Sequence, residues 1–203
     1  MIPHWLSPIE QASQNSLSLT SQGHPDKGHR YAAVLILIGP HEDHGDVLLI
    51  ERAIGQDKHS GQPAFPGGQV ESFDISRSAT ALREANEETG LDPNSVHLIA
   101  QLPNVWVPPS NFLVTPILAW WKEPHELFVG DESEVQRIQR VPIADITNPS
   151  NRLMVRTPSG FIGPAFNIAS MLVWGFTGGL LSDIVDLGGW TQPWDQSRIE
   201  EIK

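Results

Sequence analysis

The chain has 203 residues, a hydrophobic share of 39% and a charged share of 18%, as expected for one globular domain with a sizeable core. Its formal net charge of −11 argues against binding to nucleic acids or anionic membranes, because no basic stripe is available to neutralise phosphates. The lack of cysteine excludes disulfides and thiol chemistry, which fits a cytoplasmic protein.

The amino-terminal part predicts an arm followed by a pair of strands. Residues 1–29 are polar and predict an irregular arm with a short helix around residues 9–14, without the pattern of a signal peptide. Residues 31–39 form an apolar run rich in β-branched residues, which predicts a buried strand. Residues 47–51 predict its partner strand, and residues 52–66 a loop.

The stretch from Phe65 to Leu91 predicts a glycine turn followed by a helix. The turn is Pro66-Gly67-Gly68, either Asp74 or Ser76 is suited to cap the start of the helix, and Gly90 is suited to end it. At 3.6 residues per turn, three carboxylates fall within an arc of about 100°: Glu84, Glu87 and Glu88. The opposite face is expected to pack on the core through Ile75, Ala79 and Leu82.

The three carboxylates predict a cation site. Like charges on one helix face repel one another unless a cation lies between them, and Mg²⁺ prefers oxygen ligands of this kind. The alternative is an acidic face exposed to solvent. The fixed offsets between the Gly-Gly turn, the Arg83-Glu84 pair, the Glu87-Glu88 pair and Gly90 favour the metal site.

The rest of the chain predicts further strands and a final helix. Strands are expected at residues 96–102, 112–121 and 134–142, a loop at 103–111, a short helix at 144–147, a hairpin at 152–165, a helix at 167–181 and a short charged helix from residue 195. Residues 157–182 carry no charge, but their prolines and glycines argue against a membrane span. This order of elements predicts an α/β sandwich with a mixed sheet.

The glycine turn and carboxylate helix resemble the box of the Nudix hydrolases. The matching residues are Gly68, Arg83, Glu84, Ala85, Glu87, Glu88, Gly90 and Leu91. Two features depart from the box: Asp74 replaces a glutamate, and eight rather than seven residues separate it from Arg83. This longer spacing is common in the coenzyme A diphosphatase branch, which the chain also resembles at Leu48-Leu49, Ala53, His59, Gly61, residues 65–68, residues 114–116 and residues 174–177. Position 57, however, holds Asp where that branch carries an arginine.

The resemblance implies a Nudix-type α-β-α sandwich with a central mixed sheet. It implies a Nudix domain at residues 30–185, with residues 186–203 as a carboxyl-terminal tail. The implied reaction is hydrolysis of a nucleoside diphosphate linked to another moiety, with coenzyme A or a related nucleotide as the candidate substrate. The implied cofactor is Mg²⁺ or Mn²⁺, and its implied ligands are the Gly67 carbonyl, Glu84, Glu87 and Glu88.

The resemblance also implies roles for other side chains. Arg83 would hold Glu84 in place. The general base stays open between a box glutamate and Glu134 in a later loop, with Glu132 behind it; either loop acid is otherwise an exposed surface group. The candidate substrate-binding residues are Arg52, Lys58, Phe65, Gly68, Trp106 and Phe112. Core packing explains Trp106 and Phe112 equally well.

Three alternatives to this function differ in what they require of the sequence. One is a nucleotide-sensing Nudix-like module without turnover, which loss of box carboxylates would favour, and none is lost. Another is a Nudix hydrolase for ADP-ribose or NADH. An isopentenyl diphosphate isomerase is excluded. By resemblance that Nudix-fold enzyme uses a catalytic cysteine, and this chain has no cysteine. The expected partner is a small nucleotide, and a homodimer is compatible with this prediction.

Overall fold

The centre of the molecule is a mixed β-sheet. The structure is a computed structural model that describes residues 2–14, 28–42, 44–54, 61–108 and 110–202. Strand β1 (Arg30–Gly39) pairs in parallel with β7 (Phe112–Trp121) and antiparallel with β2 (Asp46–Arg52). The other strands of this sheet, all paired antiparallel, are β3 (Pro63–Ala64), β4 (Gly67–Gln69), β5 (Val96–Gln101), β6 (Val105–Val107) and β8 (Val135–Pro142).

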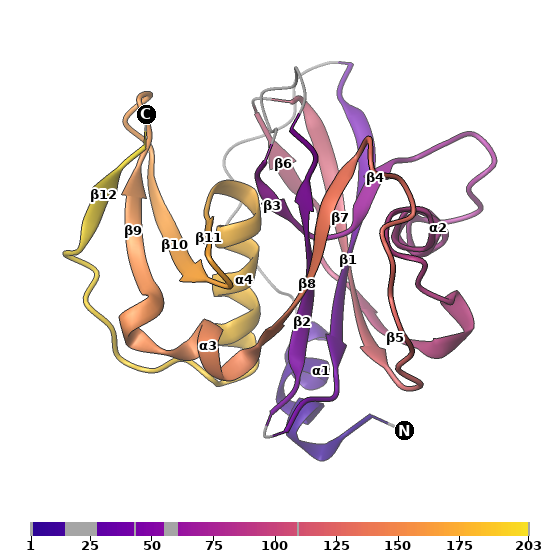
Figure 1. The fold of residues 1–203 in the computed structure, drawn as a ribbon, viewed down its shortest axis with the longest axis horizontal. Coiled ribbons are helices and arrows are strands. Elements are labelled where there is room, and N and C mark those ends of the chain that lie inside the picture. The colour runs from indigo at the N-terminus through magenta and orange to yellow at the C-terminus, as the bar shows by residue number, and fades with distance from the viewer. Residues whose placement is uncertain (1, 15–27, 43, 55–60, 109, 203) are drawn as a thin grey trace.

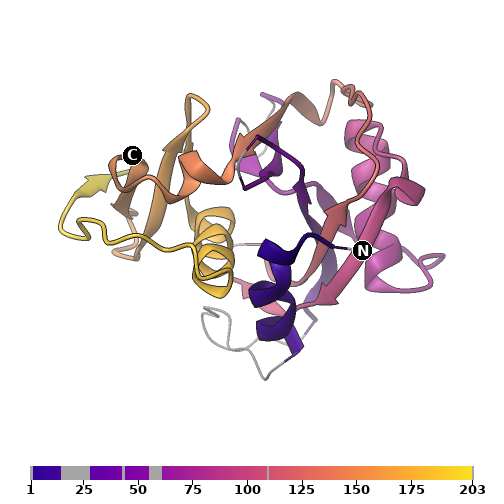
Figure 2. The same ribbon diagram turned by 90° about the horizontal axis from the view of Figure 1, so that it is seen from below.

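Helices cover both faces of this sheet. Helix α2 (Arg77–Thr89) lies on one face, and α1 (Ser7–Gln14) and α4 (Gly175–Leu187) lie on the other (Figures 1 and 2). The short helices are η1 (His4–Leu6), η2 (Pro93–Ser95), α3 (Ile143–Thr147) and η3 (Pro149–Asn151). This arrangement confirms the predicted α-β-α sandwich with a central mixed sheet.

A smaller sheet follows the main one in the chain. Its strand order is β11 (Met171–Val173), β10 (Ile162–Ile168), β9 (Arg152–Arg156) and β12 (Ile199–Glu201). Figures 1 and 2 both show α4 between this sheet and the main sheet. Helix α4 therefore packs on both.

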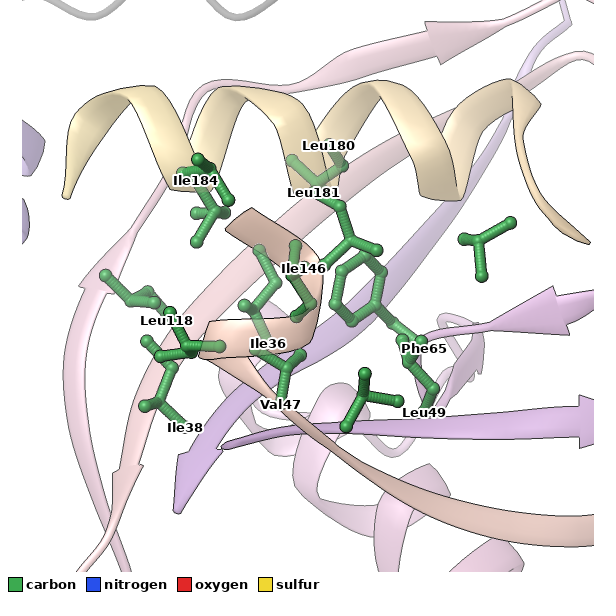
Figure 3. Packing of buried hydrophobic residues seen from close by; sticks show 14 of the residues in the cluster. Ile36, Ile38, Val47, Leu49, Phe65, Leu118, Ile146, Leu180, Leu181 and Ile184 are labelled. Atoms are coloured by element: carbon green, nitrogen blue, oxygen red, sulfur yellow. The ribbon is translucent and has the colours of Figure 1, made fainter. Parts of the chain in front are cut away.

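The core has two layers because β1 is buried on both faces. Alternate residues of a strand point to opposite faces. Ala33, Leu35 and Leu37 pack with Ala81 and Ala85 of α2. Ile36 and Ile38 instead join the cluster under α4, part of which is shown in Figure 3.

The predicted strands are confirmed, whereas the helix predicted at residues 167–181 is confirmed only from residue 175 and the helix predicted after residue 195 is wrong. Residues 167–173 end β10 and form β11, because Ala169 and Ser170 adopt positive φ angles of 50° and 61° and make a tight turn between these strands. Helix α4 starts only at Gly175 and extends past the predicted domain boundary at residue 185. The charged segment after Asp195 forms β12, which pairs in parallel with β9. The predicted loop at residues 103–111 contains β6.

Two expectations about packing also need correction. Leu6 and Ile9 are fully buried in the main cluster, so the described part of the predicted arm contributes to the core. Ile75 is 95% exposed, because it precedes the first residue of α2. Leu82 packs against the core cluster as expected, and the buried Ala81 and Ala85 join it there. Within the described ranges, no helix has the length and apolar character needed to span a membrane.

Candidate active site

Helix α2 begins and ends at the residues that the sequence suggested. The Ser76 hydroxyl caps its start by accepting a hydrogen bond of 3.1 Å from the Ala79 N–H. Gly90 ends it in the left-handed conformation (φ 67°), and its N–H donates to the Asn86 carbonyl. These caps fix where the helix starts and stops, and therefore which way its carboxylates face.

Glu88 is the buried acid of the site. Its side chain accepts a hydrogen bond of 2.9 Å from the Gly67 N–H, and the residue is only 2% exposed. Burial raises the pKa of Glu88 to about 8, the Gly67 N–H and the charge of Arg52 lower it, and the charges of Glu84 and Glu134 raise it further. The ionised form of Glu88 is therefore disfavoured, because the Gly67 N–H and Arg52 do not fully offset the cost of burying its negative charge.

Glu84 lies one helical turn before Glu88 and against the glycine turn. A Cβ atom on Gly68 would lie 2.5 Å from the carboxyl carbon of Glu84, so this close approach requires glycine. Burial raises the pKa of Glu84, whereas Arg83 lowers it through its charge and hydrogen bond. The Arg83 guanidinium contacts the Glu84 carboxylate at 2.9 Å.

Arg83 contacts three of the acidic side chains around it. It donates two hydrogen bonds of 3.1 Å to Asp74, and it contacts Glu87 at 2.9 Å. These bonds are the main reason that the pKa of Asp74 is lowered to about 2. Asp74 also accepts hydrogen bonds from the Glu71 N–H and the Thr80 hydroxyl. The departure from the Nudix box at position 74 thus preserves a strong pair with Arg83.

A later loop brings Glu134 to the same site. The Gly130 N–H donates to the Glu88 carbonyl at 3.1 Å, and a Cβ atom on Gly130 would overlap the Glu87 carbonyl oxygen. The Glu134 carbonyl accepts from the Ala53 N–H at 2.8 Å. The charge of Glu134 raises the pKa of both Glu84 and Glu88. Sequence reasoning named Glu134 but missed Gly130, whose signal is the glycine directly before the acidic run.

The candidate substrate-binding residues do not all lie at this site. Arg52, at the end of β2, is close enough for its charge to lower the pKa of Glu88. Gly68 lies against Glu84, whereas Lys58 and Asp57 lie outside the described residues. Phe65 is 2% exposed and belongs to the main core cluster, so its assignment to substrate binding is replaced by a packing role.

Trp106 and Phe112 lie on opposite faces of the main sheet. Trp106 is paired with Leu113, whereas Phe112 is paired with Val107, and paired residues share a face while neighbours along a strand do not. The two rings therefore do not form one stacking platform, and a role in substrate binding stays a prediction for each ring separately. Phe112 stacks under the Arg30 guanidinium, 4.1 Å from its ring centre.

The donor chemistry of the site fits a hard divalent cation. Glu84, Glu87, Glu88 and the Gly67 carbonyl supply only oxygen, which suits Mg²⁺ and Mn²⁺. The raised pKa values of Glu84 and Glu88 indicate that these two carboxylates are short of positive charge. In the described part of the chain, however, no three acidic or histidine side chains converge on one cation position. Glu84 and Glu87 contact Arg83 instead, so holding a cation requires their side chains to turn.

The fold and the site together define an α/β sandwich with a carboxylate helix held against a glycine turn. The chain belongs to the NUDIX domain family, which matches residues 28–158. It is 41% identical over 121 residues to the proteins named "Uncharacterized Nudix hydrolase NudL" of Salmonella paratyphi B and Salmonella newport. These matches cover 60% of this chain and 62% of each relative, so the chain spans less than two thirds of their length.

A solved structure shares the fold. The Nudix hydrolase RenU from M. smegmatis matches with a TM-score of 0.57 and 16% sequence identity, over 90% of this chain and 100% of that one. This likeness extends beyond the region that matches the family. It therefore includes at least part of the chain after residue 158.

Proposed function

We propose that this protein is a metal-dependent hydrolase that cleaves the diphosphate of a nucleoside diphosphate linked to another moiety. Membership of the NUDIX domain family supports the reaction class. The observation that carries the proposal is the buried Glu88, whose pKa is raised by burial and by the neighbouring carboxylates of Glu84 and Glu134. Carboxyl groups with a strongly shifted pKa cluster at functional sites, and an acidic face exposed to solvent would not bury Glu88 in this way.

The chain's own residues have distinct parts in this chemistry. A bound Mg²⁺ or Mn²⁺ would neutralise the diphosphate and lower the pKa of the attacking water. Glu84, Glu87, Glu88 and the Gly67 carbonyl would hold it, and the Gly67 N–H keeps Glu88 in place. Arg83 would hold Glu84 beside the site through their contact of 2.9 Å until Glu84 turns toward the cation. Glu134, whose charge is felt by both Glu84 and Glu88, is the proposed general base.

Coenzyme A or a related nucleotide is the proposed substrate class. The support is the branch signature around residues 48–68 and 174–177. Asp57, in place of an arginine, argues for weaker binding of this anionic ligand. ADP-ribose and NADH are therefore the next substrates to test.

The test is a hydrolysis screen with matched variants. Coenzyme A, ADP-ribose, NADH, dinucleoside polyphosphates and nucleoside triphosphates would be incubated with the protein and Mg²⁺ or Mn²⁺, with an excess of EDTA as the control. We expect turnover that EDTA abolishes, a loss of kcat of about a hundredfold or more in Glu88→Gln, and unchanged turnover in the exposed variant Glu123→Gln. Tight nucleotide binding without turnover would support the sensing module instead, and full activity in EDTA would refute the metal site.

A further inference from the structure

A hydrogen bond from the carboxyl-terminal part of the chain reaches the strand that leads into the glycine turn. The Thr177 hydroxyl, in the first turn of α4, donates to the Pro63 carbonyl of β3 at 3.1 Å. The bond is buried, and Thr177 is 6% exposed. Thr177 lies outside residues 28–158, the region that matches the family, whereas Pro63 lies inside it.

The start of α4 is packed closely against the small sheet. Trp174 has an extended backbone and Gly175 a φ of 63°, and this change of direction starts the helix. A Cβ atom on Gly178 would lie 2.8 Å from the Pro164 carbonyl and 3.1 Å from the Val173 carbonyl. The first turn therefore packs directly on the backbone of β10 and β11. The small sheet thus fixes the position from which Thr177 donates.

The short segment from Pro63 to Gly67 links the hydrogen bond of Thr177 to the candidate active site. Each step has its own contact: Ala64 pairs with Ile50, the Pro66 carbonyl accepts from the Leu35 N–H at 2.8 Å, and the Gly67 N–H donates to Glu88 at 2.9 Å. Phe65 is buried in the cluster that contains Leu181 of α4, and its ring points toward that helix in Figure 3. A shift at Pro63 therefore reaches the donor to Glu88 within four residues.

We propose that Thr177 is a positioning residue for the candidate active site. Through Pro63 it sets the place of Gly67 and so of the Glu88 carboxylate, which makes α4 part of the hydrolytic unit although it lies beyond the family match. The effect on kcat that this inference predicts rests on the proposed function. The consequence for the Pro63–Gly67 segment itself is independent of any substrate.

The kinetic test compares Thr177→Val with Thr177→Ser. Valine nearly matches the shape of threonine but cannot donate the hydrogen bond, whereas serine retains the hydroxyl. We expect kcat to fall about tenfold in Thr177→Val with KM changed by less than about twofold, and Thr177→Ser to stay near the wild type. Thr177→Ala provides the same test if the valine variant does not fold.

A second measurement needs neither substrate nor turnover. Hydrogen–deuterium exchange of the backbone amides of residues 64, 65 and 67–69 and of Leu35 should be faster in Thr177→Val than in the wild type. Calorimetric titration with Mn²⁺ should show weaker binding in the same variant. Both measurements remain informative if no compound in the substrate screen is cleaved.

Thr147→Val is the matched control. Thr147 is 5% exposed, and its hydroxyl donates within α3 to the Ile143 and Ala144 carbonyls. This variant should lose thermal stability but keep the wild-type kcat and the wild-type exchange at residues 64–69. Unchanged exchange in Thr177→Val, or equal loss of kcat in both valine variants, would overturn the proposal. Absence of turnover in the wild type would refute the proposed function, and hydrogen exchange and Mn²⁺ titration would then decide the role of Thr177.

Discussion

Replacing Glu88 with glutamine isolates the cost of burying an ionisable carboxyl group at this site. Glutamine has nearly the same shape and can still accept the hydrogen bond from the Gly67 N–H, but it carries no charge. In the absence of metal, the wild-type carboxylate is 2% exposed and is surrounded by other acids. We therefore expect Glu88→Gln to increase the free energy of unfolding at neutral pH, although the same variant is expected to lower kcat.

The pKa of Glu88 sets the magnitude and the pH range of this effect. Its pKa is about 8 in the folded protein, against an ordinary value of 4.5. Between these values the folded state binds more protons than the unfolded state, so the stability of the wild type falls as the pH rises, by up to about 1.4 kcal/mol per pH unit. Glu88→Gln lacks this contribution. The variant should be more stable than the wild type by on the order of 3 kcal/mol at neutral pH, with no difference below about pH 4.

The assay is urea denaturation in EDTA across this pH range. The control is Glu123→Gln, whose side chain is 74% exposed and should show little change at any pH. Adding Mn²⁺ should stabilise the wild type more than Glu88→Gln, because the ion binds the folded state through the carboxylate that the variant lacks. A variant that is less stable than the wild type at neutral pH in EDTA, or a difference that does not depend on pH, would refute this reasoning.

Three further changes test the rest of the site. Gly68→Ala should lower kcat at least about tenfold without unfolding the protein, because the added Cβ displaces Glu84. The control Gly179→Ala, with open space around its Cβ, should keep the wild-type kcat in steady-state kinetics, and circular dichroism checks that both variants are folded. The lowered pKa of Asp74 stabilises the folded state at every pH above the ordinary pKa of 3.8, and Arg83→Gln should remove this stabilisation. Urea denaturation should therefore show a lower free energy of unfolding at neutral pH, and the difference should shrink as the pH falls toward 2. Asp57→Arg should raise kcat/KM for coenzyme A by roughly tenfold or more, mostly through KM, and no change would place Asp57 outside the substrate site.

The elements that could be predicted from the sequence are those with local signals. The strand at residues 112–121 is apolar except for Thr115, and it is found with the same bounds. Ser76 and Gly90 carry their capping preference in their own chemistry, so the ends of α2 follow from the sequence. The three glutamates share a helix face because of helical geometry alone.

What could not be predicted depends on tertiary contacts and on unusual backbone. The turn at Ala169 and Ser170 has positive φ angles without a glycine, so a strand pair looked like the start of a helix. The burial of Phe65 depends on α4, which lies more than a hundred residues later in the chain. Trp106 and Phe112 are separated by the register of β6 on β7, which no local pattern reports.

The balance of charges around Arg83 explains how the site tolerates its departure from the Nudix box. One guanidinium contacts Asp74, Glu84 and Glu87, whereas Glu88 accepts a backbone N–H and feels the charge of Arg52. If Glu84 and Glu87 turn toward a divalent ion, Arg83 still donates two hydrogen bonds to Asp74, so it is not left unpaired. Asp74 is itself held by the Glu71 N–H and the Thr80 hydroxyl, so it does not follow the moving carboxylates. The aspartate at this position therefore allows two glutamates to exchange partners at low cost, while Glu88 stays fixed by Gly67.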